Sequence, residues 1–410
     1  MLKKLILAAG LALAATTAFT QPSLAECEFK TDKTVKSLSA GFEAWKAMTD
    51  AMKECGSSIE ANLDQEYREK LPEAMRASPA LYNIGGVSNG TIVPLLNDGS
   101  VRELDDLVEK FGSELTPNQL IKVDGKTVAV AMMVNAQHLM YRKDILDELD
   151  IEVPKTWDEV LAAAQKIKES GKMEYPLGAT MKSGWNLAQE FNNMFLGFGG
   201  EFVTAENQPS INTEAGRKAL QKLKEITQYL DPEYLTDDST TVQQKMQQGK
   251  IAMTNLWASR AGAMNDEAES QVVGKVEMAA APLAEEGAKP ATTIWWDGIV
   301  LAKNQSDEEA EAAFRVALEG MDTEMVNAEG NNDAAVWLIP GYKPGPLAQG
   351  VAQSAAAGAA TYPSTTWMGL MHTAVGNNVA DYLTGSKDEE ATLKAIEEDY
   401  TTAAKEAGIL

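Results

Sequence analysis

The residue types that most often carry chemistry are scarce in this chain, because its 410 residues include two histidines and two cysteines. No Cys-x-x-Cys or His-x-x-x-His spacing occurs, so these four residues do not form a zinc motif. Neither His138 nor His372 has a serine or cysteine at a spacing that indicates a catalytic partner. We therefore expect no metal site, no cofactor and no nucleophilic catalysis.

Carboxylates are the other candidates for chemistry, since the chain has 60 aspartates and glutamates. A pair of carboxylates acts as acid and base in glycosidases, so an exported carbohydrate-active enzyme is a distant alternative. Carboxylates are also abundant on any acidic protein surface, and their number alone does not favour catalysis. We expect a protein without enzymatic activity, and release of reducing ends or unsaturated products from a panel of sugars would contradict this.

The composition is that of a globular protein, with 44% hydrophobic and 23% charged residues. This length suits two or three domain-sized units. The 36 lysines and arginines against 60 acidic residues give a formal net charge of −24. Such a charge repels phosphate backbones and anionic lipid surfaces, which argues against binding to nucleic acid or to a membrane surface.

The N-terminus has the features of a secretory signal peptide. Lys3 and Lys4 give a positive segment, residues 5–19 form an apolar segment too short to span a membrane, and Ala25 ends a small-x-small cleavage site. We expect cleavage after Ala25, so that the mature protein begins at Glu26 and is released into the periplasm without an anchor.

Exported proteins can keep disulfide bonds, and Cys27 and Cys55 are the only candidates. A bond between them would tie the mature N-terminus to the end of the first predicted helix. On the chain-entropy model it would stabilise the fold by about 3 kcal/mol. Two buried thiols are the alternative that the sequence leaves open.

Strand-like and helix-like segments alternate in the first part of the chain, which is typical of α/β proteins. The first helix has Trp45, Met48 and Met52 at three- and four-residue spacings, so these side chains share one face. Gly85 and Gly86 follow the third predicted strand and indicate a backbone position that faces a ligand crevice. The predicted strands are 35–40, 58–63 and 80–84, and the predicted helices are 43–54 and 67–77.

Local signals continue further along the chain. A turn at Asp124 separates two predicted strands within 122–140. Thr156 is a good helix N-cap, and Glu159, three residues on, completes a capping box. An amphipathic pattern predicts another helix over 307–319.

Several short motifs occur in the order found in one protein family. Residues 141–146 (Tyr-Arg-Lys-Asp-Ile-Leu) and 154–159 (Pro-Lys-Thr-Trp-Asp-Glu) resemble the "YNKDLL … PKTWDE" segment of the maltose-binding-protein-like group, the sugar-binding proteins that serve ABC importers. Residues 95–107 are similar to that family's "LL..G.L.PLDDL" turn. Residues 198–200 and 249–254 are similar to its "FGG" and "GKAAMT" segments. The likeness spans nearly the whole mature chain.

The resemblance implies two doubly wound α/β lobes joined by a multi-strand hinge, the type II topology of periplasmic binding proteins, which closes around a ligand. The hinge is expected near residue 134, at 294–298 and at 341–345. The lobes implied are 26–133 plus 299–341 for lobe one and 135–293 plus 345–410 for lobe two.

The same resemblance implies capture of a sugar or sugar derivative and its delivery to an ABC-type permease, by a monomer and without chemistry. Two alternatives use the same fold. An anionic sugar or polyol derivative needs a cation in the cleft, for which Arg260 and Lys343 are candidates. A polyamine needs several converging carboxylates, for which Asp64, Glu66 and Asp297 are candidates.

The aromatic candidates for the ligand site come from positions that the resemblance places at the cleft. Trp257 follows the "GKIAMT" segment, and Trp367 is similar to the tryptophan of the family's "FWYAVRTAV" segment. In both cases the family's tryptophan lies against a sugar ring. Trp185 opens a helix at a loop tip and Trp296 lies at an interlobe crossing. A tryptophan face suits the C–H face of a pyranose, whereas core packing is the alternative for each residue.

Polar candidates complete the predicted ligand site, together with Arg260. The resemblance aligns Asn135 with a hinge residue that reaches a sugar hydroxyl, and an amide can both donate and accept there. Its alternative role is to satisfy a backbone group. Gln65 follows the second predicted strand, and Ser88 and Asn89 follow the third.

Overall fold

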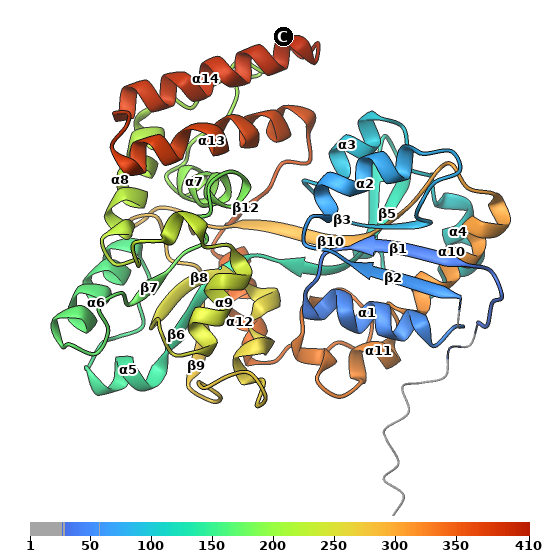
Figure 1. The fold of residues 1–410 in the computed structure, drawn as a ribbon, viewed down its shortest axis with the longest axis horizontal. Coiled ribbons are helices and arrows are strands. Elements are labelled where there is room, and N and C mark those ends of the chain that lie inside the picture. The colour runs from blue at the N-terminus through green and yellow to red at the C-terminus, as the bar shows by residue number, and fades with distance from the viewer. Residues whose placement is uncertain (1–26, 28, 57) are drawn as a thin grey trace, which may run out of the picture.

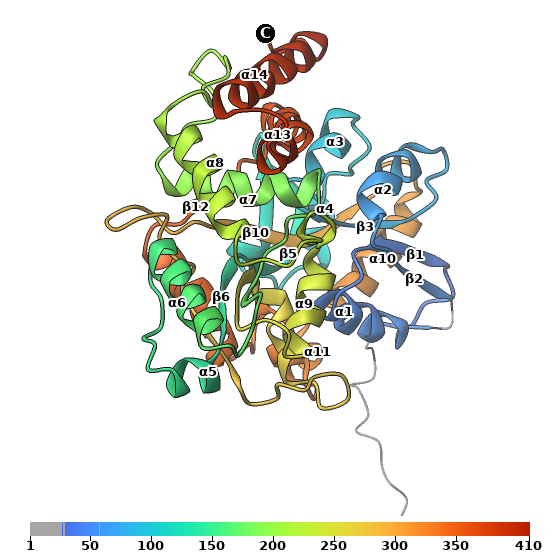
Figure 2. The ribbon, with the colours of Figure 1, turned by 60° about the vertical axis from the view of Figure 1, so that its left-hand side comes forward.

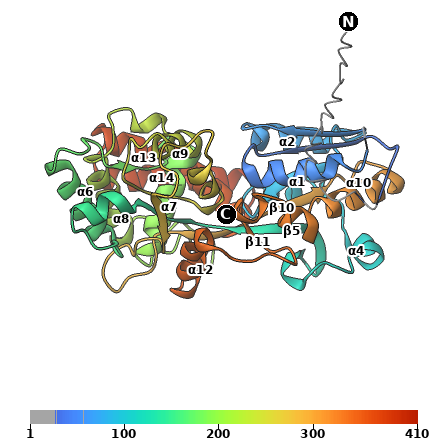
Figure 3. The ribbon, with the colours of Figure 1, turned by 90° about the horizontal axis from the view of Figure 1, so that it is seen from below.

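The computed structural model describes residues 27, 29–56 and 58–410. The predicted signal peptide and its cleavage site lie outside these residues. The described chain forms two α/β lobes that lie side by side (Figure 1). Figure 3 shows the lobes from below, with extended strands running between them. None of the helices in the described residues is long and apolar enough to cross a membrane.

The first lobe is built on the larger of two sheets. Its eight strands are β1 (Val35–Ser39), β2 (Ile59–Leu63), β3 (Ile84–Ser88), β4 (Leu120–Val123), β5 (Lys126–Asn135), β10 (Thr293–Leu301), β11 (Val336–Trp337) and β12 (Ala360–Thr361). The main order is β11-β5-β10-β3-β1-β2. β1 pairs in parallel with β2 and β3, whereas β10 runs antiparallel to β3 and β5.

Helices cover both faces of the larger sheet, as a doubly wound lobe requires. These helices are α1 (Glu43–Lys53), α2 (Tyr67–Arg76), α3 (Ile92–Asn97), α4 (Asp105–Phe111), α10 (Asp307–Glu319) and α11 (Thr323–Asn327). In Figure 1, α2 and α3 lie above the sheet and α1 and α11 below it. Trp45, Met48 and Met52 are buried on one face of α1, as their spacing predicts.

The second lobe is built on a four-stranded sheet. Its strands are β6 (Gln137–Arg142), β7 (Leu177–Gly178), β8 (Met253–Trp257) and β9 (Val276–Ala279), in the order β7-β8-β6-β9. Its helices are α5 (Lys143–Glu148), α6 (Trp157–Glu169), α7 (Trp185–Gly197), α8 (Glu214–Thr227), α9 (Ser239–Gln247), α12 (Gln349–Ala356), α13 (Thr366–Thr384) and α14 (Glu389–Glu406). Figure 2 shows α13 between α14 and α7, both of which it contacts.

The chain changes from one hydrophobic core to the other at three places. At the first place, the chain leaves the first-lobe core after Met133 and enters the second-lobe core at Leu139. The junction of β5 and β6 lies between these two residues. The second change lies on β10, between Trp295 and Ile299. The third lies between β11 and β12. The predicted architecture of two α/β lobes joined by several crossings is confirmed.

Local signals in the sequence had the expected effect at helix starts. The Thr156 side chain accepts a hydrogen bond from the Glu159 amide at 3.2 Å, and the Glu159 carboxylate accepts one from the Thr156 amide at 3.3 Å. α10 spans the predicted range.

Cys27 and Cys55 form a disulfide with Cα atoms 5.1 Å apart, so the alternative of two free thiols is wrong.

The third strand was misplaced by the sequence. β3 spans Ile84–Ser88 and not 80–84. Its two glycines have low β propensity, so the sequence does not indicate a strand there. Gly86 does not face a ligand crevice. A Cβ there would lie 2.4 Å from the Cβ of Ser39, so this glycine permits close packing between β3 and β1.

Candidate functional site

A cavity of about 780 Å³ lies between the lobes and is lined by both. Its size is that of a small-molecule site. The walls combine aromatic rings, hydroxyls, amides and charged groups. The lining includes Phe42, Gln65, Glu66, Arg68, Glu69 and Ser88 from the first lobe, Lys182, Trp185, Asp238, Thr240, Trp257, Ser259 and Arg260 from the second, and Asn135, Trp295 and Asp297 from the crossing strands.

Strand β10 supplies the floor of the cavity through its alternation. Trp295 and Asp297 are two residues apart and share the face that lines the cavity, whereas Trp296 points to the other face. Pairing with the neighbouring strands sets Trp295 opposite Asn135 of β5 and Asp297 opposite Ser88 of β3. Four cavity residues are thereby positioned by backbone pairing alone.

A β-bulge follows Asp297, where the register between β10 and β5 shifts. Gly298 makes this bulge possible, because a Cβ there would lie 2.2 Å from the Val130 carbonyl oxygen. The bulge thus sets the direction in which the carboxyl group of Asp297 leaves the strand.

Three tryptophans form one aromatic wall. The rings of Trp185 and Trp257 each meet Trp295 edge to face, with centroids 5.8 Å apart. Behind Trp295, the centroid of the Tyr362 ring lies 4.0 Å away, and the two ring planes are tilted by 30°. Contacts of this kind hold large rings in fixed orientations, so the wall is preorganised.

His372 supports this wall from behind. Its Nε2 lies 2.9 Å from the Trp185 carbonyl oxygen, which can only accept, so Nε2 carries the proton. Its Nδ1 therefore accepts from the Tyr362 hydroxyl at 2.8 Å and from the Asn192 amide at 3.1 Å. Burial lowers the pKa of His372 to about 4, which keeps the imidazole neutral.

A buried chain of hydrogen bonds also leads away from the wall. The Trp295 indole N–H donates to Thr293 Oγ1 at 2.8 Å, and that hydroxyl donates to Asn193 at 2.9 Å. Asn193 donates to Gln137 at 2.7 Å, and Gln137 donates to Glu190 at 2.8 Å. Burial raises the pKa of Glu190 to about 7. Because its N–H is engaged here, Trp295 offers the cavity ring surface only.

Two charged groups of the cavity, Asp297 and Arg260, are withdrawn from water, whereas Glu66, Arg68, Glu69 and Lys182 are exposed. Burial raises the pKa of Asp297 to about 7, although the charge of Arg68 and a hydrogen bond from Asn135 oppose this shift. Burial also lowers the pKa of Arg260 to about 10, and the nearby charge of Arg68 acts in the same direction.

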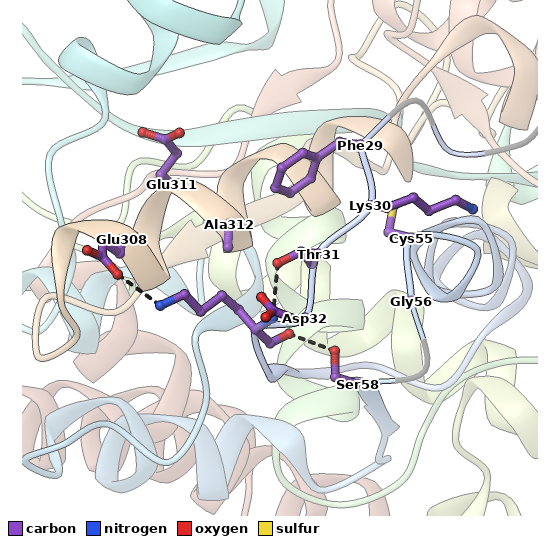
Figure 4. Close-up of a pocket in the computed structure, with 11 residues that line it drawn as sticks. Phe29, Lys30, Thr31, Asp32, Cys55, Gly56, Ser58, Glu308, Glu311 and Ala312 are labelled. Carbon is purple, nitrogen blue, oxygen red and sulfur yellow. Dashed lines mark hydrogen bonds and ion pairs between the residues drawn. The ribbon is translucent and has the colours of Figure 1, made fainter.

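A second cavity, of about 870 Å³, lies beside the N-terminal segment and α10 (Figure 4). Two of its charged groups already pair with each other at the surface, since the Lys33 ammonium lies 2.8 Å from the Glu308 carboxylate. Its aromatic ring, Phe29, is covered by the guanidinium of Arg315 at 3.6 Å. The interlobe cavity is therefore the better candidate for a ligand site.

Comparison with known proteins supports the same conclusion about the fold. Residues 39–319 match the sequence model of the bacterial extracellular solute-binding proteins. The chain belongs to this family. A curated relative, a probable ABC transporter-binding protein of Deinococcus radiodurans, is 29% identical over 46% of this chain and 46% of its own length. The solute-binding protein thus spans about half the length of the curated relatives it matches.

Solved structures of similar proteins cover more of the chain. A solute-binding protein of Agrobacterium radiobacter in complex with ribitol superposes with a TM-score of 0.80, at 20% identity, over 92% of this chain and 100% of its own. One from Agrobacterium vitis with bound D-mannitol gives 0.77, at 19% identity, over 91% and 99%. At this identity the similarity shows the fold alone.

The structure places most of the predicted site residues of the solute-binding protein around one cavity. Their role in ligand binding stays a prediction. The residues predicted from the sequence that line it are Gln65, Ser88, Asn135, Trp185, Trp257, Arg260 and Asp297.

Three predicted residues do not line the cavity. Trp296 packs against the core of the first lobe, because strand alternation turns it away from Trp295. Trp367, in the first turn of α13, packs against the core of the second lobe. Asn89 is fully buried, and its amide donates to the Tyr362 carbonyl oxygen at 3.0 Å, which anchors the segment behind the wall.

Some of the charged residues considered for a polyamine or an anionic ligand line the cavity, and others do not. Of the three carboxylates considered for a polyamine, Glu66 and Asp297 line the cavity, whereas Asp64 does not and pairs with Lys70 at 2.6 Å. Lys343, considered for an anionic ligand, is not among the lining residues.

Sequence reasoning missed Trp295, Arg68 and the supporting His372. Alternation gave a signal for Trp295, since a strand that points Asp297 into a cleft points Trp295 there too. Arg68 follows Gln65 closely, in the first turn of α2. Nothing local in the sequence marks His372, whose partners lie on α7 and near β12.

Residues 86–90 have the Gly-x-Ser-x-Gly spacing of a hydrolase elbow. Ser88 does line the cavity, but its hydroxyl lies 3.2 Å from Thr91 Oγ1. Both nitrogens of His372 are engaged elsewhere, and His138 is fully buried within β6. The pattern therefore supplies a polar cavity residue and no activated nucleophile among the described residues.

Proposed function

We propose that this solute-binding protein captures a sugar or sugar derivative in the interlobe cavity and delivers it to an ABC-type permease, with no chemical step. The observation that supports this most is the combination of Trp185, Trp257 and Trp295 with hydroxyl and amide side chains in one cavity. Sugars present apolar C–H faces and polar edges, and this lining suits both.

Each part of the lining has a proposed role. The ring faces of the tryptophans cover the C–H faces of the ligand, whereas Ser88, Asn135 and Gln65 bind its hydroxyls. Asn135 already donates to Ser259 Oγ at 3.1 Å, which links β5 to the second lobe. Its carbonyl oxygen accepts from the Ser259 backbone amide at 3.4 Å, and its NH2 group also donates to Asp297. The amide therefore satisfies a backbone group as well, and the second lone pair of its carbonyl oxygen is what remains for a ligand hydroxyl.

Delivery depends on lobe closure. The division into lobe one and lobe two, with hinges near 134, 294–298 and 341–345, fits the three places where the chain changes hydrophobic core. A ligand that contacts both walls favours the closed state, and a permease can recognise that state. We propose that the protein acts as a monomer in the periplasm after cleavage behind Ala25.

The other candidate functions find less support in the cavity. A polyamine would face Arg68, Arg260 and Lys182, three cations that repel it. An exported carbohydrate-active enzyme would need an acid and a base at a set separation, and Asp297 is the single deeply buried carboxyl among the described lining residues.

A thermal-shift screen tests this proposal. The panel contains monosaccharides, disaccharides, trisaccharides, polyols and sugar acids, because a ligand that binds only the native state raises the melting temperature. We expect at least one member to raise it by several degrees in the parent and not in Trp257→Ala. No shift with any member, while the protein is folded, would contradict the proposal.

A further inference from the structure

Two arginines enter the cavity from opposite lobes. Arg68, on α2, lies with its guanidinium carbon 4.2 Å from the ring centroid of Trp185 in the second lobe. Arg260, in the short 3-10 helix Ala258–Arg260, lies 5.6 Å from the ring centroid of Phe42 in the first lobe. Each guanidinium thus contacts an aromatic ring of the other lobe across the cavity.

These contacts leave hydrogen-bonding capacity unused. A guanidinium near a ring face interacts with it through its charge, and this leaves its N–H donors available for hydrogen bonds. Arg260 donates one hydrogen bond, to Gln243 Oε1 at 3.0 Å. Within the described residues, neither Arg68 nor Arg260 has a carboxylate oxygen within 4.0 Å, although several other arginines do. Arginines with such a partner are Arg76, Arg102, Arg142 and Arg217.

Arg260 is the costly one of the two, because its guanidinium is withdrawn from water and no carboxylate pairs with it directly. Burial is the main cause of its lowered pKa; the charge of Arg68 acts in the same direction, and the charges of Asp238 and Glu43 oppose it. Arg68 is exposed, so its guanidinium stays hydrated and mainly adds repulsion toward Arg260. An anion placed between the two would pair with Arg260 and offset that repulsion.

None of the acidic groups of the lining pairs directly with either arginine, although the charge of Asp238 acts on Arg260 at longer range. Asp238 accepts hydrogen bonds from the Thr240 and Thr241 amides and lies 3.4 Å from Lys182, and Glu66 pairs with Lys70 at 3.2 Å. Glu69 is exposed on α2. Asp297 holds its proton up to near-neutral pH, so it can donate to a ligand as well as accept.

The geometry points to a ligand that carries one anionic group, a carboxylate or a phosphate, on its polyhydroxylated body, held jointly by the guanidiniums of Arg68 and Arg260. This inference rests on the proposed function, because the body of the ligand is the sugar that the tryptophans cover. Since the two arginines belong to different lobes, the anion would bridge them and favour the closed state.

Calorimetric titration with matched pairs tests the inference. The pairs are glucuronate and glucose, gluconate and glucitol, and glucose 6-phosphate and glucose, so that the arms separate a carboxylate from a phosphate. We expect at least one acidic member to bind about tenfold or more tightly than its neutral partner, since hydrogen bonds to charged groups are the stronger ones. Higher salt should reduce this preference.

Single substitutions assign the effect to the arginines. Arg68→Gln and Arg260→Gln should each weaken binding of the acidic ligand about tenfold or more, while binding of a neutral partner changes less than about threefold. Arg76→Gln, on the same helix as Arg68 but paired with Asp98 at 3.2 Å, is the matched control and should bind like the parent. Arg68 is exposed, so its variant keeps the test available if Arg260→Gln folds poorly.

The outcomes separate the two proposals. Neutral members that bind as tightly as their acidic partners would overturn the anionic ligand and leave sugar capture standing. An acidic preference that survives in both arginine variants would also overturn it. Binding of no sugar or sugar acid at all would overturn sugar capture itself, and the inference with it.

Discussion

The imidazole of His372 lies against the indole of Trp185, with ring centroids 4.9 Å apart and planes 29° from parallel. Its Nε2 also donates to the carbonyl oxygen of the same tryptophan. One buried histidine on α13 thus fixes both the backbone and the ring of a residue that opens α7 and faces the cavity. Contacts from a residue that does not line the cavity therefore help to fix the aromatic wall.

Replacing this histidine should therefore damage both stability and binding. His372→Phe leaves the Tyr362 hydroxyl, the Asn192 amide and the Trp185 carbonyl without their partner, and we expect the free energy of unfolding to fall by about 2 kcal/mol or more. Urea denaturation measures this, and calorimetry should show weaker ligand binding. His138→Leu is the control for binding, because the His138 nitrogens have no hydrogen-bond partner among the described residues and the residue does not line the cavity. Unchanged affinity in His372→Phe would contradict a positioning role.

Glu190 should make the stability of the protein depend on pH. Its pKa in the folded state, about 7, lies above the unfolded value, so the folded state binds the proton more tightly. Stability should therefore fall as pH rises from about 4.5 to about 7 and level off above that range. Asp297, whose pKa is also raised to about 7, acts in the same direction.

Glu190→Gln removes one of these two contributions. The variant and the parent should melt alike near pH 4. The melting temperature of the variant should exceed that of the parent increasingly up to about pH 7, and the difference should then stay constant to pH 8. Asp297→Asn provides a second series with the same sign. A difference in melting temperature between Glu190→Gln and the parent that stays constant over this whole range would contradict a raised pKa of Glu190 in the folded state.

The disulfide between Cys27 and Cys55 should act on stability alone. The double substitution to serine opens a loop with a sequence separation of 28 residues, and the chain-entropy model gives a loss of about 3 to 4 kcal/mol in the free energy of unfolding. Ligand affinity should not change, because neither cysteine lines the interlobe cavity. Treating the parent with a reductant should reproduce the loss, and a reductant should have no further effect on the serine variant.

Asn135→Ala should weaken ligand binding and also lower stability. The amide lines the cavity, but it also donates to Ser259 Oγ, so its removal costs about 1 kcal/mol in the free energy of unfolding as well as a ligand contact. Denaturation and calorimetry on the same preparation separate the two effects. A loss of stability with full ligand affinity would reduce Asn135 to a structural role.

Much of the fold was accessible from the sequence, because it depends on local signals. The capping box at Thr156, the turn at Asp124 and the amphipathic pattern of α10 each act within a few residues, and each appears where it was expected. The third strand, predicted at 80–84, lies at Ile84–Ser88, and the reason for this difference is local as well. Two glycines lower the strand propensity of its sequence, and pairing with β1 and β10 overrides this.

The candidate site was less accessible, because its geometry depends on contacts between distant segments. The sequence places both Trp295 and Trp296 at the crossing, but it does not show which face of a crossing strand meets the ligand. The contact of Arg68 with Trp185 joins residues that are adjacent only once both lobes are formed. Strand pairing and lobe packing, which no single motif encodes, bring these groups together.

The most direct measurement of the central claim is a calorimetric titration of the best ligand from the thermal-shift screen into the parent, Trp257→Ala and Trp295→Ala. The parent should bind one molecule per chain, and loss of either ring should cost on the order of 2 kcal/mol in binding, about thirtyfold, as for other buried aromatic anchors. Circular dichroism confirms that each variant is folded. Full affinity in both folded variants would contradict capture of the ligand against the tryptophans of the interlobe cavity.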